Sequence, residues 1–214
     1  KNKHLFPAFV FASLALSLNW LIYIWAVNSG HIVDASLGYF LTPLINTIFG
    51  LFFFKDRLSR LQWLSLCLAV LGVICQLVML GRLPWISLAL ALSFGTYGML
   101  RKKEPIESIP GLFLETLLLT PIALGLLVWF WANNSPDFFQ IKLHFNIFLL
   151  ASGIVTTVPL LLFAYGAKRL RLTSLGLMQY IAPTCQLFIG VMVYEEVLNS
   201  GYLLSFAFIW AGLI

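Results

Sequence analysis

Two amide side chains in long apolar segments are the residues of this sequence best suited to bind a solute. Asn46 lies in the middle of the segment Ile32–Phe54, and Gln186 lies in the middle of the segment Leu172–Tyr194. In a membrane helix an amide either hydrogen-bonds a solute or bonds a neighbouring helix as part of the packing. Packing is the simpler interpretation for each residue alone. Two amides at equivalent positions of two helices favour a shared central cavity.

A proline, a glycine and a further polar residue accompany each amide at the same spacing. The two sets are Tyr39, Pro43, Asn46 and Gly50, and, 140 positions later, Gln179, Pro183, Gln186 and Gly190. Intervals of three and four residues place side chains on one face of a helix. Proline removes a backbone donor and disturbs the preceding turn, so Pro43 and Pro183 are candidates for hinges or for static bends.

Other polar and aromatic residues lie close to these two faces. The further candidates to line the cavity are Asn19, Trp20, Tyr39, Gln179 and Tyr180. Asn19 and Trp20 would supply an amide and a ring that stacks on a solute, although Trp20 fits equally well as a core aromatic.

Glu115 is the one acid that lies clearly inside an apolar run, GLFLETLLLTP. A carboxylate at the centre of a bilayer is costly, so such residues are candidates for proton coupling or solute binding. Glu115 follows Pro110 by five residues, however, which is about 7.5 Å along a helix. A carboxylate near the interface, held by the basic segment Arg101–Lys103, is therefore an equally good interpretation. Proton coupling is an expectation that rests on Glu115 alone.

The composition requires lipid around the segments that carry these residues. The chain is 61% hydrophobic and 10% charged, whereas an ordinary soluble domain is roughly 25% charged. A soluble protein of 214 residues cannot bury so much apolar surface. The sequence therefore predicts an all-α polytopic membrane protein. The net charge of +5 comes from basic residues in short loops between apolar runs. Such residues are typical signals of membrane topology, so we expect no nucleic-acid partner.

Eight apolar segments are candidate membrane spans. They are Leu5–Val27, Ile32–Phe54, Leu58–Leu80, Pro84–Leu100, Pro110–Trp131, Phe145–Leu170, Leu172–Tyr194 and Tyr202–Ile214. A span needs about 20 apolar residues, so the last is too short unless the native chain continues. The sequence also begins without methionine, and we expect a fragment.

The basic residues predict the orientation. If successive loops alternate between the two sides, one side receives Lys1, Lys3, Lys55, Arg57, Arg60, Arg101, Lys102, Lys103, Lys168, Arg169 and Arg171. The other side receives only Arg82 and Lys142. By the positive-inside rule, the start of the sequence and the expected Arg101–Lys103 loop face the cytoplasm.

The 140-residue offset predicts two repeats that run in opposite directions. Five spans separate each helix from its counterpart, and an odd number reverses the direction of the chain. Inverted repeats allow many secondary transporters to alternate access to a site near the midplane. We expect residues 1–82 to hold three spans of the first repeat and residues 83–214 to hold all five of the second. Two spans of the first repeat should then precede Lys1, which makes ten in the complete protein.

Several long segments resemble one branch of a transporter superfamily. They are NWLIYIWAVNSGHIVDASLGYFLTPLINTIFG (Asn19–Gly50), RLQWLSLCLAVLGV (Arg60–Val73), LALSFGTYGMLRKK (Leu90–Lys103), GIVTTVPLLLFAYGAKRLRLTSLGLMQYIAPT (Gly153–Thr184) and SFAFIW (Ser205–Trp210). The chain resembles the RarD-type branch of the drug/metabolite transporter superfamily, with EamA repeats. This resemblance implies a protein of the bacterial inner membrane, with two inverted five-helix repeats, that moves small molecules. The resemblance does not identify the substrate.

The function expected from the sequence is therefore a secondary transporter, or permease, of small organic solutes. The sequence has no HExxH, Gly-rich phosphate loop or GxSxG motif, and the three cysteines lie in apolar runs as small hydrophobes. We expect no cofactor, no metal site and no enzymatic activity. The alternatives are a non-transporting membrane scaffold or sensor, which would lack a polar cavity, and an intramembrane enzyme, for which Glu115 alone is too little.

Overall fold

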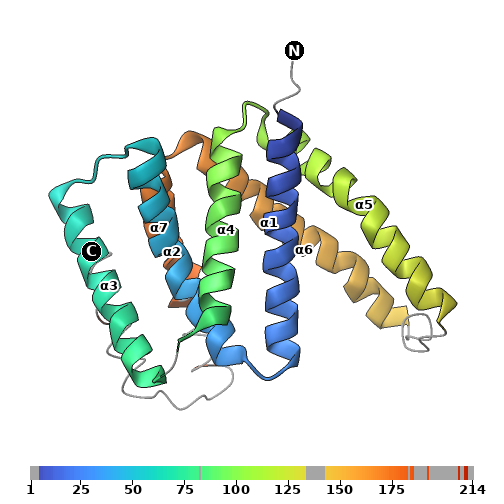
Figure 1. The fold of residues 1–214 in the computed structure, drawn as a ribbon, viewed down its shortest axis with the longest axis horizontal. Coiled ribbons are helices and arrows are strands. Elements are labelled where there is room, and N and C mark those ends of the chain that lie inside the picture. The colour runs from blue at the N-terminus through green and yellow to red at the C-terminus, as the bar shows by residue number, and fades with distance from the viewer. Residues whose placement is uncertain are drawn as a thin grey trace. The chain divides into compact units, whose positions relative to one another are not determined.

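A computed structural model of the chain describes residues 5–81, 83–133, 143–182, 184–185, 192, 207 and 210–211. The described residues form helices and connecting turns, without a strand. The seven helices are α1 (Leu5–Asn28), α2 (Ile32–Phe54), α3 (Arg60–Leu80), α4 (Trp85–Lys103), α5 (Ser108–Ala132), α6 (Leu143–Arg169) and α7 (Leu172–Met178) (Figure 1). The ends of α1 to α6 lie within three residues of the predicted spans.

Four described helical stretches are long and apolar enough to cross a membrane. They are Phe6–Asn28, Asp34–Phe54, Ser108–Ala132 and Ala151–Arg169. The prediction of an all-α membrane protein is thereby confirmed for this part of the chain. The expected eighth span, Tyr202–Ile214, lies almost entirely outside the described residues.

The helices form two compact units. Unit 1 comprises residues 1–14 and 100–169, and unit 2 comprises residues 15–99 and 170–214. In unit 1, α5 packs against α6, whereas in unit 2, α2 packs against both α7 and α3. The helices α1 and α4 contribute residues to both units.

Helix α2 is the central element of unit 2. Buried apolar side chains of α2, α3 and α4, together with Tyr180, form its largest core cluster. The approach of α4 to α2 depends on two glycines. A Cβ atom on Gly38 would lie 3.1 Å from Cβ of Leu90, and a Cβ atom on Gly95 would lie 2.5 Å from Cγ2 of Ile45. These glycines therefore let side chains of one helix pack closely against the backbone of the other.

The expected seventh span is broken shortly after it begins. Helix α7 ends at Met178, Gln179 and Tyr180 form a turn, and helical backbone resumes at Ile181. The carbonyl of Gln179 accepts from the N–H of Ala182 at 3.2 Å, a bond over three residues. A regular helix would take that bond from residue 183, which is a proline and has no N–H to donate. By contrast, α2 continues through Pro43 as one helix.

The segment Arg101–Lys103, expected to be a loop, is instead the last turn of α4. Cationic side chains are favourable at that end of a helix, because the last carbonyl groups carry partial negative charge. The basic residues used to predict topology thus also stabilise the C-terminal end of α4.

Candidate functional site

Asn46 and Gln179, two of the expected cavity residues, meet where α2 passes the break after α7. Asn46 is fully buried, and its Nδ2 donates to Oε1 of Gln179 at 2.5 Å. Its Oδ1 is also buried and has no hydrogen-bond partner within the described residues. A buried acceptor without a partner costs about 1–3 kcal/mol. Asn46 can therefore accept one further hydrogen bond.

A glycine allows this close contact between α2 and α7. A Cβ atom on Gly176 would lie 2.7 Å from the carbonyl oxygen of Pro43 and 2.9 Å from Oγ1 of Thr47. Thr47 Oγ1 itself donates to that Pro43 carbonyl at 2.9 Å. The two helices thus touch through backbone atoms one turn from Asn46, as small residues permit in membrane proteins.

Tyr180 and Asn19 take part in packing in this structure. The Tyr180 ring is buried in the apolar cluster of α2 and α3, and its Oη has no hydrogen-bond partner in the described part of the chain. Asn19 Nδ2 donates to the carbonyl oxygen of Leu90 at 2.9 Å and to Oγ of Ser93 at 3.0 Å. Asn19 thereby ties α1 to α4, which is the packing role of a membrane amide.

Trp20 and Tyr39 are more exposed than the residues above, at 41% and 37%. The Tyr39 ring meets Tyr23 edge to face, with 5.9 Å between the ring centroids. Gln186 and Pro183 lie outside the described residues. The central cavity expected between Asn46 and Gln186 therefore stays a prediction.

Asp56, which the sequence did not single out, fastens one end of the contact between α2 and α7. Its Oδ2 accepts from the backbone N–H of Thr173 at 3.2 Å and from Thr173 Oγ1 at 3.1 Å. The Asp56 N–H donates to the carbonyl of Gly50 at 3.1 Å. Next to it, Nη1 of Arg171 donates to the carbonyl of Arg57 at 3.1 Å. Side-chain bonds thus join the end of α2 to the start of α7.

Asp56→Ala is expected to lower the free energy of unfolding by about 1–2 kcal/mol, the usual loss for a side chain that caps a first helical turn. Thermal unfolding of the purified protein in detergent measures it. Thr173→Val keeps the backbone N–H but removes the hydroxyl that donates to Asp56. In that background Asp56→Ala should lower the free energy of unfolding by less than it does in the wild type, because the bond between the two side chains is already gone. Equal losses in the two backgrounds would show that the hydroxyl contributes nothing.

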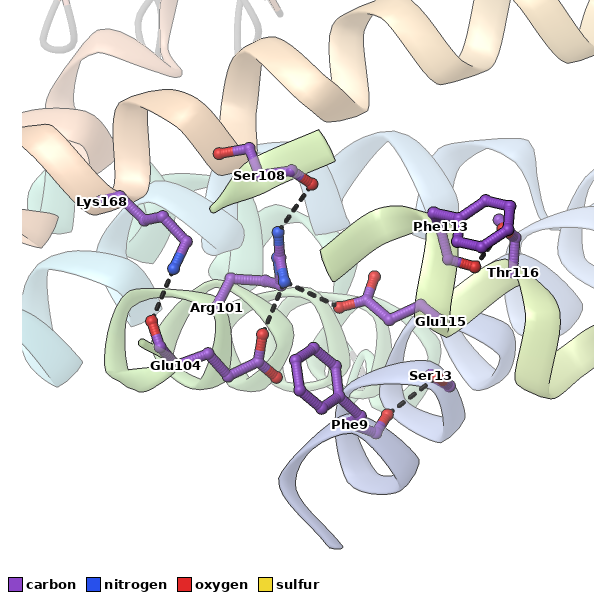
Figure 2. Close-up of polar contacts among 9 residues, drawn as sticks. All are labelled: Phe9, Ser13, Arg101, Glu104, Ser108, Phe113, Glu115, Thr116 and Lys168. Atoms are coloured by element: carbon purple, nitrogen blue, oxygen red, sulfur yellow. Dashed lines mark hydrogen bonds and ion pairs between the residues drawn. The ribbon is translucent and has the colours of Figure 1, made fainter. Parts of the chain in front are cut away.

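Glu115 lies in a buried cluster of unit 1 around Arg101, with Glu104 as the third ionisable residue (Figure 2). Nη1 of Arg101 is 2.5 Å from Oε2 of Glu104 and 3.4 Å from Oε1 of Glu115. Nη2 of Arg101 donates to the carbonyl of Ser108 at 3.0 Å. Glu115 is thus held by one of the basic residues that its position predicted, and Glu104 is an additional acid that the sequence did not single out.

The end of α6 adds two lysine contacts to this region. Lys168 Nζ donates to the carbonyl oxygen of Glu104 at 2.6 Å, and Lys102 Nζ donates to the carbonyl oxygen of Ala167 at 3.1 Å. Burial raises the pKa of the Glu104 carboxyl, and the charges of Arg101 and Lys168 offset part of that effect. The region therefore combines bonds that hold helix ends together with a carboxyl group whose ionisation is disfavoured.

Comparisons with known proteins agree with the predicted family. The EamA-like transporter family matches residues 1–78 and 83–214. Protein RarD of Salmonella typhimurium is 46% identical over 195 residues, covering 91% of this chain and 66% of that protein. The uncharacterized transporter YojE of Bacillus subtilis is 44% identical over 214 residues, covering 100% and 71%. An uncharacterized transporter of Vibrio cholerae is 43% identical over 202 residues, covering 94% and 67%.

The chain spans 66–71% of the length of these three relatives. The matches confirm the resemblance to the RarD-type branch that the sequence carries. They agree with the apolar helices in indicating a multi-pass membrane protein. This chain belongs to the EamA-like transporter family.

Proposed function

We propose that this protein is a secondary transporter of small organic solutes, metabolites or drug-like compounds, in the inner membrane of a bacterium. The observation that carries the proposal is the buried contact of Asn46, in a helix long and apolar enough to cross a membrane, with Gln179 in the turn that follows α7. Discontinuous helices with polar groups near the midplane are typical of solute sites in transporters. Membership of a transporter family supports the same function.

In this proposal the solute binds where α2 passes α7. Asn46 and Gln179 are its first contacts, and Asn19, Trp20, Tyr39, Tyr180 and Gln186 are retained as lining residues. The charged residues of α2 and its C-cap, Asp34 and Lys55, lie at the two ends of the helix. The groups that α2 offers near Asn46 are therefore uncharged, and the Asn46 oxygen suits a solute with hydrogen-bond donors.

Access alternates through movement of two inverted repeats, residues 1–82 and 83–214. Helix α2 belongs to the first repeat and α7 to the second, so their contact at Gly176 lies between the parts that move. Pro43 and Pro183 are the proposed hinges. The Arg101–Lys103 turn faces the cytoplasm, and a proton gradient drives transport through Glu115.

Asn46→Leu in the full-length protein is expected to reduce solute flux at least tenfold. The variant removes the hydrogen-bonding groups and leaves Gln179 without its donor. The measurement is uptake of a labelled panel of metabolites and drug-like compounds into proteoliposomes, with an imposed pH gradient and without one. Asn28→Leu is a matched control, because Asn28 is exposed and its side chain donates to the carbonyl of Ile24 in its own helix.

A non-transporting scaffold or sensor is the second candidate, because Asn46 bonded to Gln179 is also what simple packing between helices would give. That function predicts no flux of any solute in the panel for the wild type. Asn46→Leu would then change only the thermal stability. Flux that is normal in Asn46→Leu would remove this residue from the solute site.

A further inference from the structure

The cluster around Arg101 holds two carboxylates and one guanidinium. Nη1 of Arg101 lies within ion-pair distance of both Glu104 and Glu115, at 2.5 Å and 3.4 Å, while Nη2 is occupied by the carbonyl of Ser108 (Figure 2). Both carboxylates therefore contact the same nitrogen of Arg101. All three side chains are buried. With both acids ionised they carry one negative charge in excess, and the nearby Lys168 ammonium, which also acts on Glu104, offsets part of it.

Two further atoms of this cluster have unused hydrogen-bonding capacity. Oε1 of Glu104 and Nε of Arg101 are buried and have no hydrogen-bond partner within the described residues. An ionised oxygen that is removed from water without a donor is especially unfavourable. A proton on a carboxyl group removes the charge and turns one oxygen into a donor.

Two ammonium groups of this region donate to backbone oxygens. Lys168 Nζ donates to the carbonyl of Glu104, and Lys102 Nζ donates to the carbonyl of Ala167. Residues 5–14 of α1, which place Phe9 beside the cluster in Figure 2, include no ionisable side chain. Hence α1 supplies no charge to balance the second carboxylate.

The remaining charged pair stands at the exposed edge of this region. Nη2 of Arg169 lies 3.6 Å from Oε2 of Glu107, and both side chains are largely open to solvent. The Arg169 guanidinium also lies over the ring of Tyr165, 3.5 Å from its centroid. These contacts engage Arg169 away from the buried carboxylates.

We propose that Glu104, Arg101 and Glu115 form a proton-binding site that holds one proton between the two carboxyl groups. The bond formed is an O–H bond on a carboxylate oxygen, the proton comes from water and returns to it, and no electron is transferred. The two acids titrate as one unit, because each competes for the same nitrogen of Arg101. This inference rests on the proposed transport function and adds Glu104 and Arg101 to the proton site proposed at Glu115.

Binding of the proton changes which elements Arg101 holds together. Glu104 follows α4, whereas Glu115 lies in α5. When one of them is neutral, the guanidinium keeps a charged partner on the other only. The proton thus weakens the link of α4 either to α5 or to its own following turn, which is a route from protonation to helix movement.

The experiment is infrared difference spectroscopy of the full-length protein in liposomes while the pH is stepped. The wild type should show one carboxylic acid C=O band that rises and falls with pH. Glu104→Gln and Glu115→Gln should each shift its midpoint, and the double variant should abolish it. Glu107→Gln, which removes an exposed acid from the same turn, is the matched control and should leave the band unchanged.

Solute flux on the same samples separates this inference from the transport function. A wild-type protein that transports solute but has no titrating band overturns the proton site and leaves transport standing. A titrating band in a protein without flux supports the proton site and overturns transport. A band whose midpoint follows the sodium concentration at constant pH would show that the site is a sodium site, and it would also overturn the inference.

Discussion

Gly111→Ala is expected to lower the free energy of unfolding by about 3–5 kcal/mol, the usual loss when a buried ion pair is separated. A Cβ atom at this position would overlap Nη1 of Arg101 and lie 2.7 Å from Nη2. A long side chain normally swings aside from such a clash at little cost. Arg101 has no such freedom, because its guanidinium is bound to Glu104, Glu115 and the carbonyl of Ser108.

Gly125→Ala is the matched control for this substitution, since Gly125 lies in the same helix with nothing within 4 Å of the added atom. It should be neutral, or stabilising by up to about 1 kcal/mol, because alanine favours the helix. Thermal unfolding of both variants in the same detergent measures the difference. Similar midpoints for the two would mean that Arg101 moves without loss, and the buried cluster would then add little stability.

Gly176→Ala is expected to impair transport at least tenfold and to lower stability by about 1–3 kcal/mol, as overpacking of a tight contact does. The added Cβ would meet the carbonyl oxygen of Pro43 at 2.7 Å, and Thr47 Oγ1 at 2.9 Å. A backbone carbonyl in a continuous helix cannot rotate away, so α7 must move back from α2. That shift separates Asn46 from Gln179, the pair on which the proposed solute site rests.

Two comparisons sharpen this experiment. Gly153→Ala in α6 adds the same methyl group in open space, and it should keep normal flux. Thr47→Ala in the Gly176→Ala background should restore little of the flux, since the Pro43 carbonyl remains in place. Normal flux in Gly176→Ala would show that the close contact of α2 with α7 is not needed for transport.

The helices of this protein could be predicted from sequence because lipid leaves few alternatives. A backbone surrounded by hydrocarbon must satisfy its own hydrogen bonds, so apolar segments of sufficient length form helices. Accordingly α2 begins and ends at the predicted residues, Ile32 and Phe54. The family was also recognisable, because the resemblance extends over long segments of the chain.

The partners of individual side chains could not be predicted in the same way. Spacing placed Asn46 and Glu115 on their helices, but the residue opposite each depends on how two helices cross. That crossing is decided by close contacts between residues distant in sequence, such as Gly176 of α7 against Pro43 of α2.

For Asn46, the sequence by itself determined that an amide lies in an apolar helix, one turn after a proline, in a chain of the EamA-like family. Only the tertiary structure decided that its partner is Gln179, in the turn that follows α7. Likewise, Glu115 was visible as a costly acid, whereas its sharing of Arg101 with Glu104 was not. The physical reason is the same in both cases, because periodicity assigns a residue to a face of its own helix and packing between helices selects its partner.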